Sequence, residues 1–196
     1  RYYGPRNGGW AWRIRCKETL DHQINAIALP GGRIYVYDCI LTLTHVDDEL
    51  AAVLAHEIIH VVEEHSAEQL AKSGDIQRAT EKIVTRVSRG NGQSQKGKIA
   101  VLAGMLGSTL IQMHLSREDE YEADERGFQL LVKAGYDPYK ALVLLQNIER
   151  IELSANGNQG ILGSRAFSTH PPTTDRIANL QGKIPSFNRS TIDNVK

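Results

Sequence analysis

Two histidines and a glutamate stand in the order His-Glu-x-x-His at residues 56–60 of this chain. In an α-helix, positions four residues apart lie on one face, so the rings of His56 and His60 can reach one metal ion ~2.0–2.1 Å away. Glu57 lies one step round the helix, where it can take a proton from a metal-activated water without binding the metal. The spacing predicts a site for one zinc ion per chain, with Glu57 as the general base of a metallopeptidase.

The alternative is that these histidines pack in a core without a metal. Between residues 50 and 62 the helix has apolar side chains on almost every side, which is typical of a helix in the middle of a domain. Two imidazoles and a carboxylate buried there each need a partner, and a lone buried carboxylate is costly. A metal ion satisfies all three groups, so the surroundings favour the metal site.

A catalytic zinc site needs a third protein ligand and an open position for water. His65 points about 140° away from His60 on a straight helix, so we expect it to be a surface histidine. Residues 118–125 contain six acidic residues in eight, a pattern that is more often a solvated helix face. Within that run Glu120 and Asp124 share a face, and Asp124 can accept a histidine N–H. The residues alone leave three ligand candidates open: Glu118, Glu120 and Glu122.

A resemblance separates these candidates. Glu120-Tyr-Glu-Ala-Asp124 resembles the E-x-x-x-D motif of the type I CAAX prenyl protease and HtpX family. The resemblance covers about residues 20 to 180 and includes three further blocks: 25–32, 48–57 and 168–171. It implies that Glu120 is the third zinc ligand and that Asp124 supports the site.

Two more candidates rest on the resemblance. His170 stands before two prolines, where an ordinary turn histidine is the alternative. The resemblance implies either a fourth zinc ligand that inhibits the enzyme or a donor to the reaction oxyanion. Arg176 resembles a family arginine near the site. It can stabilise developing negative charge or pair with Asp124 or another carboxylate, and we favour the structural role.

The two zinc motifs are not separated by membrane spans, which is similar to the soluble branch of the family, with BepA-type periplasmic proteases and OMA-type catalytic domains. The longest apolar stretch, Ile99 to Met113, is shorter than the ~20 residues that cross a bilayer. We interpret it as a buried helix, with a lid that touches a membrane as the alternative. Peripheral membrane association and the oligomeric state stay open.

The resemblance implies a zinc endopeptidase that acts on polypeptides. Its expected substrates are misfolded or misassembled envelope proteins, in periplasmic or other extracytoplasmic quality control. A chaperone-like binding module on a latent protease fold is the alternative function.

Composition sets the outer limits of these interpretations. The 196 residues are 41 % hydrophobic and 23 % charged, which fits a single folded domain over residues 1–196. We take the N-terminus to be truncated, because the chain begins at Arg1 without a signal-peptide pattern. The 23 basic and 23 acidic residues cancel, which argues against nucleic acid as a partner. Two cysteines, Cys16 and Cys39, are too few for a thiolate zinc site, and a bridge between them is left open.

The elements that must position the site are mainly helical. Helices are predicted from Asp47 or Asp48 to Gly74, over about 99–134, and from Tyr139 to about Leu153. A strand is expected near residues 10–16, and a β-hairpin over 25–37. The expected fold class is α+β, mainly α: a zincin-like metallopeptidase with a small β-sheet beside the active-site helix.

The second strand of that hairpin carries a further prediction. We interpret residues 31–37 as an edge strand that binds extended peptide through main-chain hydrogen bonds. The predicted substrate-binding residues are Gly32, Arg33, Ile34 and Tyr35.

Overall fold

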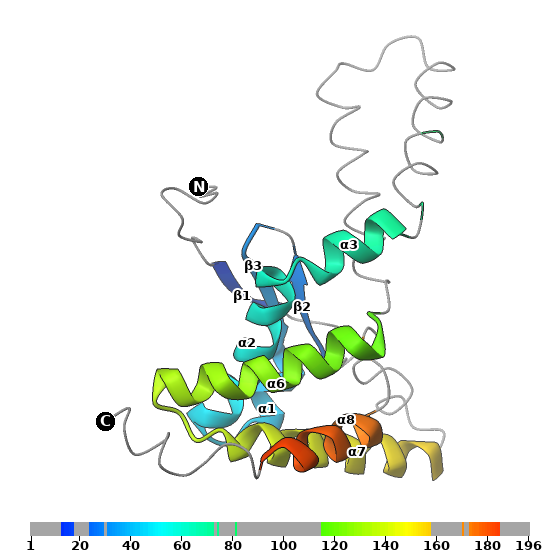
Figure 1. Cartoon of the computed structure of the whole chain (residues 1–196). Coiled ribbons are helices and arrows are strands. Elements are labelled where there is room, and N and C mark those ends of the chain that lie inside the picture. The colour runs from blue at the N-terminus through cyan, green and yellow to red at the C-terminus, as the bar shows by residue number, and fades with distance from the viewer. Residues whose placement is uncertain are drawn as a thin grey trace.

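The computed structural model describes residues 13–17, 24–29, 31–72, 74, 81, 115–157, 170 and 173–184. The strands and helices, in chain order, are β1 (Arg13–Lys17), β2 (Ala26–Leu29), β3 (Arg33–Tyr37), α1 (Asp38–Leu43), α2 (Asp47–Val62), α3 (His65–Lys72), α6 (Arg117–Ala134), α7 (Tyr139–Gly157) and α8 (Thr173–Lys183). The fold is mainly α with one small sheet, as predicted (Figure 1). The apolar stretch 99–113 lies outside the described residues.

The three strands form one sheet in the order β1-β3-β2. β2 and β3 are the predicted hairpin, antiparallel with Ala28 opposite Ile34. Gly31 and Gly32 make the turn between them with φ values of 88° and 78°, a left-handed conformation that favours glycine. β1 then pairs in parallel with the other side of β3.

This strand order overturns the prediction of an edge strand at residues 31–37. β3 has a hydrogen-bonded neighbour on both sides, so its backbone groups are used inside the sheet. Gly32, Arg33, Ile34 and Tyr35 therefore do not lie at a sheet edge that could pair with a peptide. Within the described residues the edge strands are β1 and β2.

α2 lies at the centre of the fold, between the sheet and α6 (Figure 1). Its first turn carries Asp47, Asp48 and Glu49, which suit the positive end of a helix. One side of α2 forms the main core with the sheet, α1, α6 and α7. The buried members of that core are Ile24, Ala26, Ile34, Val36, Ile40, Ala52, Val53, Ala55, Leu131, Leu144 and Ile148. A central active-site helix is what the sequence predicted.

The helix predicted to continue to Gly74 is broken into two. α2 ends at Val62, and Glu63 and Glu64 form a turn before α3 begins at His65. Glu64 has a φ of 57°, a left-handed conformation that costs a non-glycine residue roughly 1–2 kcal/mol. The chain therefore changes direction immediately after the motif of residues 56–60.

α6 packs along α2 with its acidic first turn towards the motif. Ser116 caps α6, because its side chain accepts from the Asp119 backbone N–H at 3.1 Å and its own N–H donates to the Asp119 carboxylate at 3.1 Å. Further along, the backbones of α2 and α6 approach closely at Gly127, where a Cβ would lie 3.3 Å from the His56 backbone nitrogen. The cap and this close approach place Glu120 and Asp124 opposite the histidines.

α7 and α8 pack together beside α6, and α7 also contacts α2. Their second, smaller core consists of Phe128, Val132, Leu145, Ile177 and Leu180. This packing places the first turns of α8 beside α6. Among the described residues, no helix combines the length and apolar character needed to cross a lipid bilayer.

Candidate metal centre

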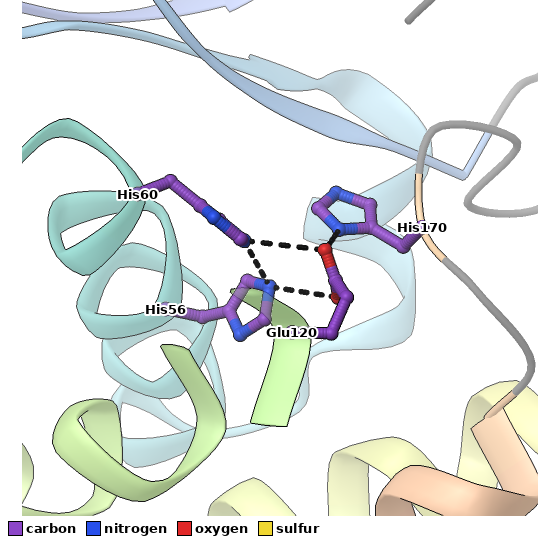
Figure 2. Close-up of side chains that lie close together, drawn as sticks. All are labelled: His56, His60, Glu120 and His170. Atoms are coloured by element: carbon purple, nitrogen blue, oxygen red, sulfur yellow. Dashed lines mark hydrogen bonds and ion pairs between the residues drawn. The ribbon is translucent and has the colours of Figure 1, made fainter. Parts of the chain in front are cut away.

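Four side chains from three parts of the chain converge beside α2 (Figure 2). His56 and His60 come from α2, Glu120 from α6, and His170 from the segment before α8. One nitrogen or oxygen atom of each lies within 4.8 Å of those of the other three. The predicted pairing of two α2 histidines with Glu120 is therefore present in the structure, with His170 as a fourth member.

The separations of these atoms fit one small cation. Glu120 Oε1 lies 3.4 Å from His60 Nε2, and Glu120 Oε2 lies 3.4 Å from His56 Nε2. Ligand atoms ~2.0–2.1 Å from a tetrahedral zinc ion stand roughly 3.3 Å apart. The two histidine Nε2 atoms also face each other at 2.9 Å. A donor set of imidazole nitrogens and carboxylate oxygen at these distances suits zinc.

Glu120 Oε2 gives independent support for a cation. This atom is buried and has no hydrogen-bond partner, although Arg176 Nη1 lies 3.0 Å away as an ion pair outside hydrogen-bond geometry. A buried polar atom without a hydrogen bond needs an explanation, and a bound ion is one of the usual ones.

A buried ion pair stands behind His56. The Nδ1 atom of His56 lies 2.9 Å from Asp124 Oδ1. Arg176 donates to both oxygens of Asp124, from Nε at 2.8 Å and from Nη2 at 2.6 Å. A histidine that binds metal through Nε2 carries its hydrogen on Nδ1, so Asp124 is placed to accept it and to orient the ring. Arg176 thus pairs with Asp124, which was one of the two possibilities considered from the sequence.

The two buried carboxylates are held in their anionic form. Burial alone raises the pKa of Asp124, but the neighbouring Arg176 outweighs it and lowers that pKa to about 2. Burial also disfavours charge on Glu120, yet His170, Arg176 and His56 hold its pKa well below the usual range. Both groups are therefore ionised at neutral pH, as a metal ligand and its support require.

The two α2 histidines differ sharply in their surroundings. Burial, and then the charge of His56, lower the pKa of His60 to about 3. Burial and the charge of Arg176 would also lower the pKa of His56. Glu120 and Asp124 outweigh them and raise this pKa to about 9. Without a metal, the carboxylates thus hold a proton at His56. The carboxylates around His56 therefore stabilise a positive charge at this position.

Glu57 and His170 lie together at the cluster. Glu57 is 2 % exposed, and burial raises its pKa. The Oε1 atom of Glu57 lies 3.6 Å from His170 Nε2, and the Nδ1 atom of His170 lies 2.6 Å from Glu120 Oε1. The ring of His170 therefore stands between the predicted base and the predicted third ligand, which is more than an ordinary turn histidine would do.

His65 is a neighbour of the cluster that was not expected from the sequence. It is 4 % exposed rather than at the surface, and its Nδ1 atom lies 2.9 Å from that of His60. The expectation of a surface histidine was wrong because it assumed a straight helix, whereas the turn at residues 63–64 brings His65 back towards His60. Glutamate is a good helix former, so Glu63 and Glu64 give no local signal for a turn.

Residues 15–184 match peptidase family M48. The chain is 28 % identical over 180 residues to the mitochondrial metalloendopeptidase OMA1 of Saccharomyces cerevisiae, covering 92 % of this chain and 49 % of that relative. It is 35 % identical over 170 residues to OMA1 of Schizosaccharomyces pombe, covering 84 % and 45 %.

The beta-barrel assembly-enhancing protease of Escherichia coli is 25 % identical over 169 residues, covering 83 % of this chain and 33 % of that relative. The chain thus spans about half or less of the length of these relatives. The match confirms the OMA- and BepA-like resemblance: this chain belongs to peptidase family M48.

Proposed function

We propose that this chain is the catalytic domain of a zinc-dependent endopeptidase, with His56, His60 and Glu120 as zinc ligands and Glu57 as the general base. The observation that carries the proposal is the convergence of the ligand atoms within 4.8 Å. Membership of family M48 supports metallopeptidase chemistry. The choice of zinc rests on the donor set, two imidazoles and a carboxylate, which is common in catalytic zinc sites.

When bound, zinc supplies a Lewis acid that activates water and polarises the scissile carbonyl. Glu57 takes the proton of the attacking water and delivers it to the leaving amine. Burial raises the pKa of Glu57, which makes it a stronger base than an exposed glutamate and suits it to both transfers. Asp124 and Arg176 hold the ring of His56 in the orientation that leaves Nε2 free for the metal.

We further propose that His170 holds the site in a closed, latent form. A catalytic zinc ion has three protein ligands and one open position, whereas a fourth protein ligand leaves no place for water. His170 belongs to the cluster of ligand atoms and contacts both Glu57 and Glu120. When this ring leaves the ligand position but stays near Glu57, it is placed to donate to the reaction oxyanion instead.

Casein cleavage and zinc content, measured on the same preparations, test both proposals. Glu57→Gln should keep one zinc ion per chain and lose cleavage by roughly 10²–10⁴-fold, because the base is removed while the ligands stay. His170→Ala should keep zinc and increase cleavage above wild type. Glu118→Gln, which changes an exposed glutamate of the same acidic run, should change neither quantity.

The possible outcomes separate the two functions. Full cleavage by Glu57→Gln, or a wild type without zinc, refutes the peptidase proposal. Zinc in every variant with cleavage in none favours the chaperone-like binding module on a latent protease fold.

The proposed substrates are misfolded or misassembled polypeptides of a cell envelope, in an extracytoplasmic compartment. Support comes from the Escherichia coli relative, which is named a beta-barrel assembly-enhancing protease. A single outer-membrane β-barrel protein, offered unfolded and folded to the His170→Ala variant, tests this proposal. Faster cleavage of the unfolded form is expected, and equal rates on both forms contradict it.

A further inference from the structure

We infer that His65 is a positioning residue for the zinc ligand His60, through the hydrogen bond between their Nδ1 atoms. This inference rests on the proposed zinc site and concerns the side of His60 that faces away from the metal. It gives the second α2 histidine a support that corresponds to Asp124 behind His56.

The ring of His65 lies between the proposed ligand His60 and a glutamate that reaches solvent. The Nδ1 atoms of His60 and His65 are 2.9 Å apart, and both residues are buried, at 2 % and 4 % exposure. On the far side of His65, its Nε2 atom lies 3.6 Å from Oε2 of Glu122, a residue that reaches solvent. Each nitrogen of the His65 ring therefore faces one specific partner.

The metal position decides the direction of the hydrogen bond. One ring nitrogen must carry the hydrogen and the other must offer a lone pair. His60 Nε2 faces Glu120 and the other ligand atoms, so it needs its lone pair for the metal and the hydrogen of His60 is on Nδ1. His65 then accepts at Nδ1 and carries its own hydrogen on Nε2, towards Glu122. The reverse direction would place the hydrogen of His60 where the metal binds.

The backbone provides a second, independent observation. His65 reaches His60 only because the chain turns at Glu63 and Glu64, and Glu64 adopts a φ of 57°. A strained conformation in a non-glycine residue persists only where the surroundings impose it, and such residues cluster at functional sites. The turn therefore brings the imidazole of His65 to the Nδ1 atom of His60, the ring nitrogen that faces away from the proposed metal position.

Competition with a chelator of known zinc affinity tests the inference. His65→Phe keeps a ring of similar shape but removes the acceptor, and it should weaken zinc binding about 10- to 100-fold, the usual effect of losing such a support. His65→Asn should restore binding to within a few fold, because its Oδ1 can accept from His60. His45→Phe is the matched control, since His45 is exposed and outside the ligand cluster, and it should change nothing.

A readout on the unmodified protein avoids the question of whether the variants fold. In the zinc-loaded wild type, ¹⁵N spectra of the imidazoles should show hydrogen on Nδ1 of His60 and on Nε2 of His65. Hydrogen on Nδ1 of His65 overturns the inference, as does wild-type zinc affinity in His65→Phe. A wild type that binds no zinc in the same assay instead refutes the proposed function, so the two failures are distinct.

Discussion

His56 and His60 lie one turn apart on α2 and face the same cluster, but the partners behind them differ in kind. Behind His56 stands the carboxylate of Asp124, bound at both oxygens by Arg176. Behind His60 stands a second imidazole, His65. The first support is a buried ion pair, and the second is a hydrogen bond between two rings.

The two supports also differ in how the chain builds them. The His56 support joins α2, α6 and α8, and its arginine is 120 positions along the chain from the ring it serves. The His60 support joins residues five positions apart through one backbone turn. The support of His56 therefore depends on how three helices pack together, whereas the support of His60 depends on local backbone conformation. Substitutions in the support of His56 should therefore reduce stability and zinc affinity more than substitutions in the support of His60.

The largest effect is expected from Asp124→Ala. This variant removes the carboxylate that accepts two hydrogen bonds from the buried Arg176, which costs about 3–5 kcal/mol of unfolding free energy. It should also weaken zinc binding about 10- to 100-fold. Urea unfolding of the metal-free protein and chelator competition measure the two losses. Asp175→Ala breaks the 2.9 Å pair with Arg117, whose members are 46 % and 59 % exposed, and should cost at most about 1 kcal/mol. Equal losses in both variants would contradict the comparison.

A smaller effect is expected where α6 approaches α2. In Gly127→Ala the new methyl group would stand 3.3 Å from the His56 backbone nitrogen and 3.5 Å from the Ala55 carbonyl carbon. Backbone atoms cannot move away as a flexible side chain can, so overpacking should cost about 1–3 kcal/mol. This cost should exceed the gain of ~1 kcal/mol from the better helix propensity of alanine, so the variant should be less stable. Because α6 carries Glu120, zinc binding should also weaken severalfold.

Gly182→Ala in α8 is the control for this prediction. No atom lies within 4 Å of the Cβ position at Gly182, so only the favourable propensity acts there. Urea unfolding should show a lower free energy of unfolding for Gly127→Ala and a slightly higher one for Gly182→Ala. Gains at both positions would mean that the two helices can separate without cost.

Much of the site was accessible from the sequence because one helix supplies its signature. Helical spacing places His56 and His60 on one face, and an apolar run around them predicts a buried helix. The third ligand was harder to predict, because helical periodicity does not decide between Glu118, Glu120 and Glu122. Only the family motif chose Glu120, and the structure places that residue in the cluster.

The errors have a common physical origin in features that no local pattern encodes. The hairpin was predicted, but the parallel pairing of β1 with β3 joins distant residues and removes the expected edge strand. His65 was assigned to the surface because a left-handed turn was not expected at Glu64, which is not a glycine. Strand order and a strained turn both depend on tertiary packing, which overrides local preference.

That turn provides the last and smallest prediction. Glu64→Gly should raise the unfolding free energy by up to about 1 kcal/mol, because glycine adopts a φ near 57° without the steric cost that other residues have there. Glu64→Ala removes the same side chain but keeps the strain, so it should give no such gain. Zinc affinity should stay within about twofold in both, since the direction of the chain and the position of His65 are unchanged. If alanine stabilises as much as glycine, the turn is unstrained, and the local support of His60 rests on the ring contact alone.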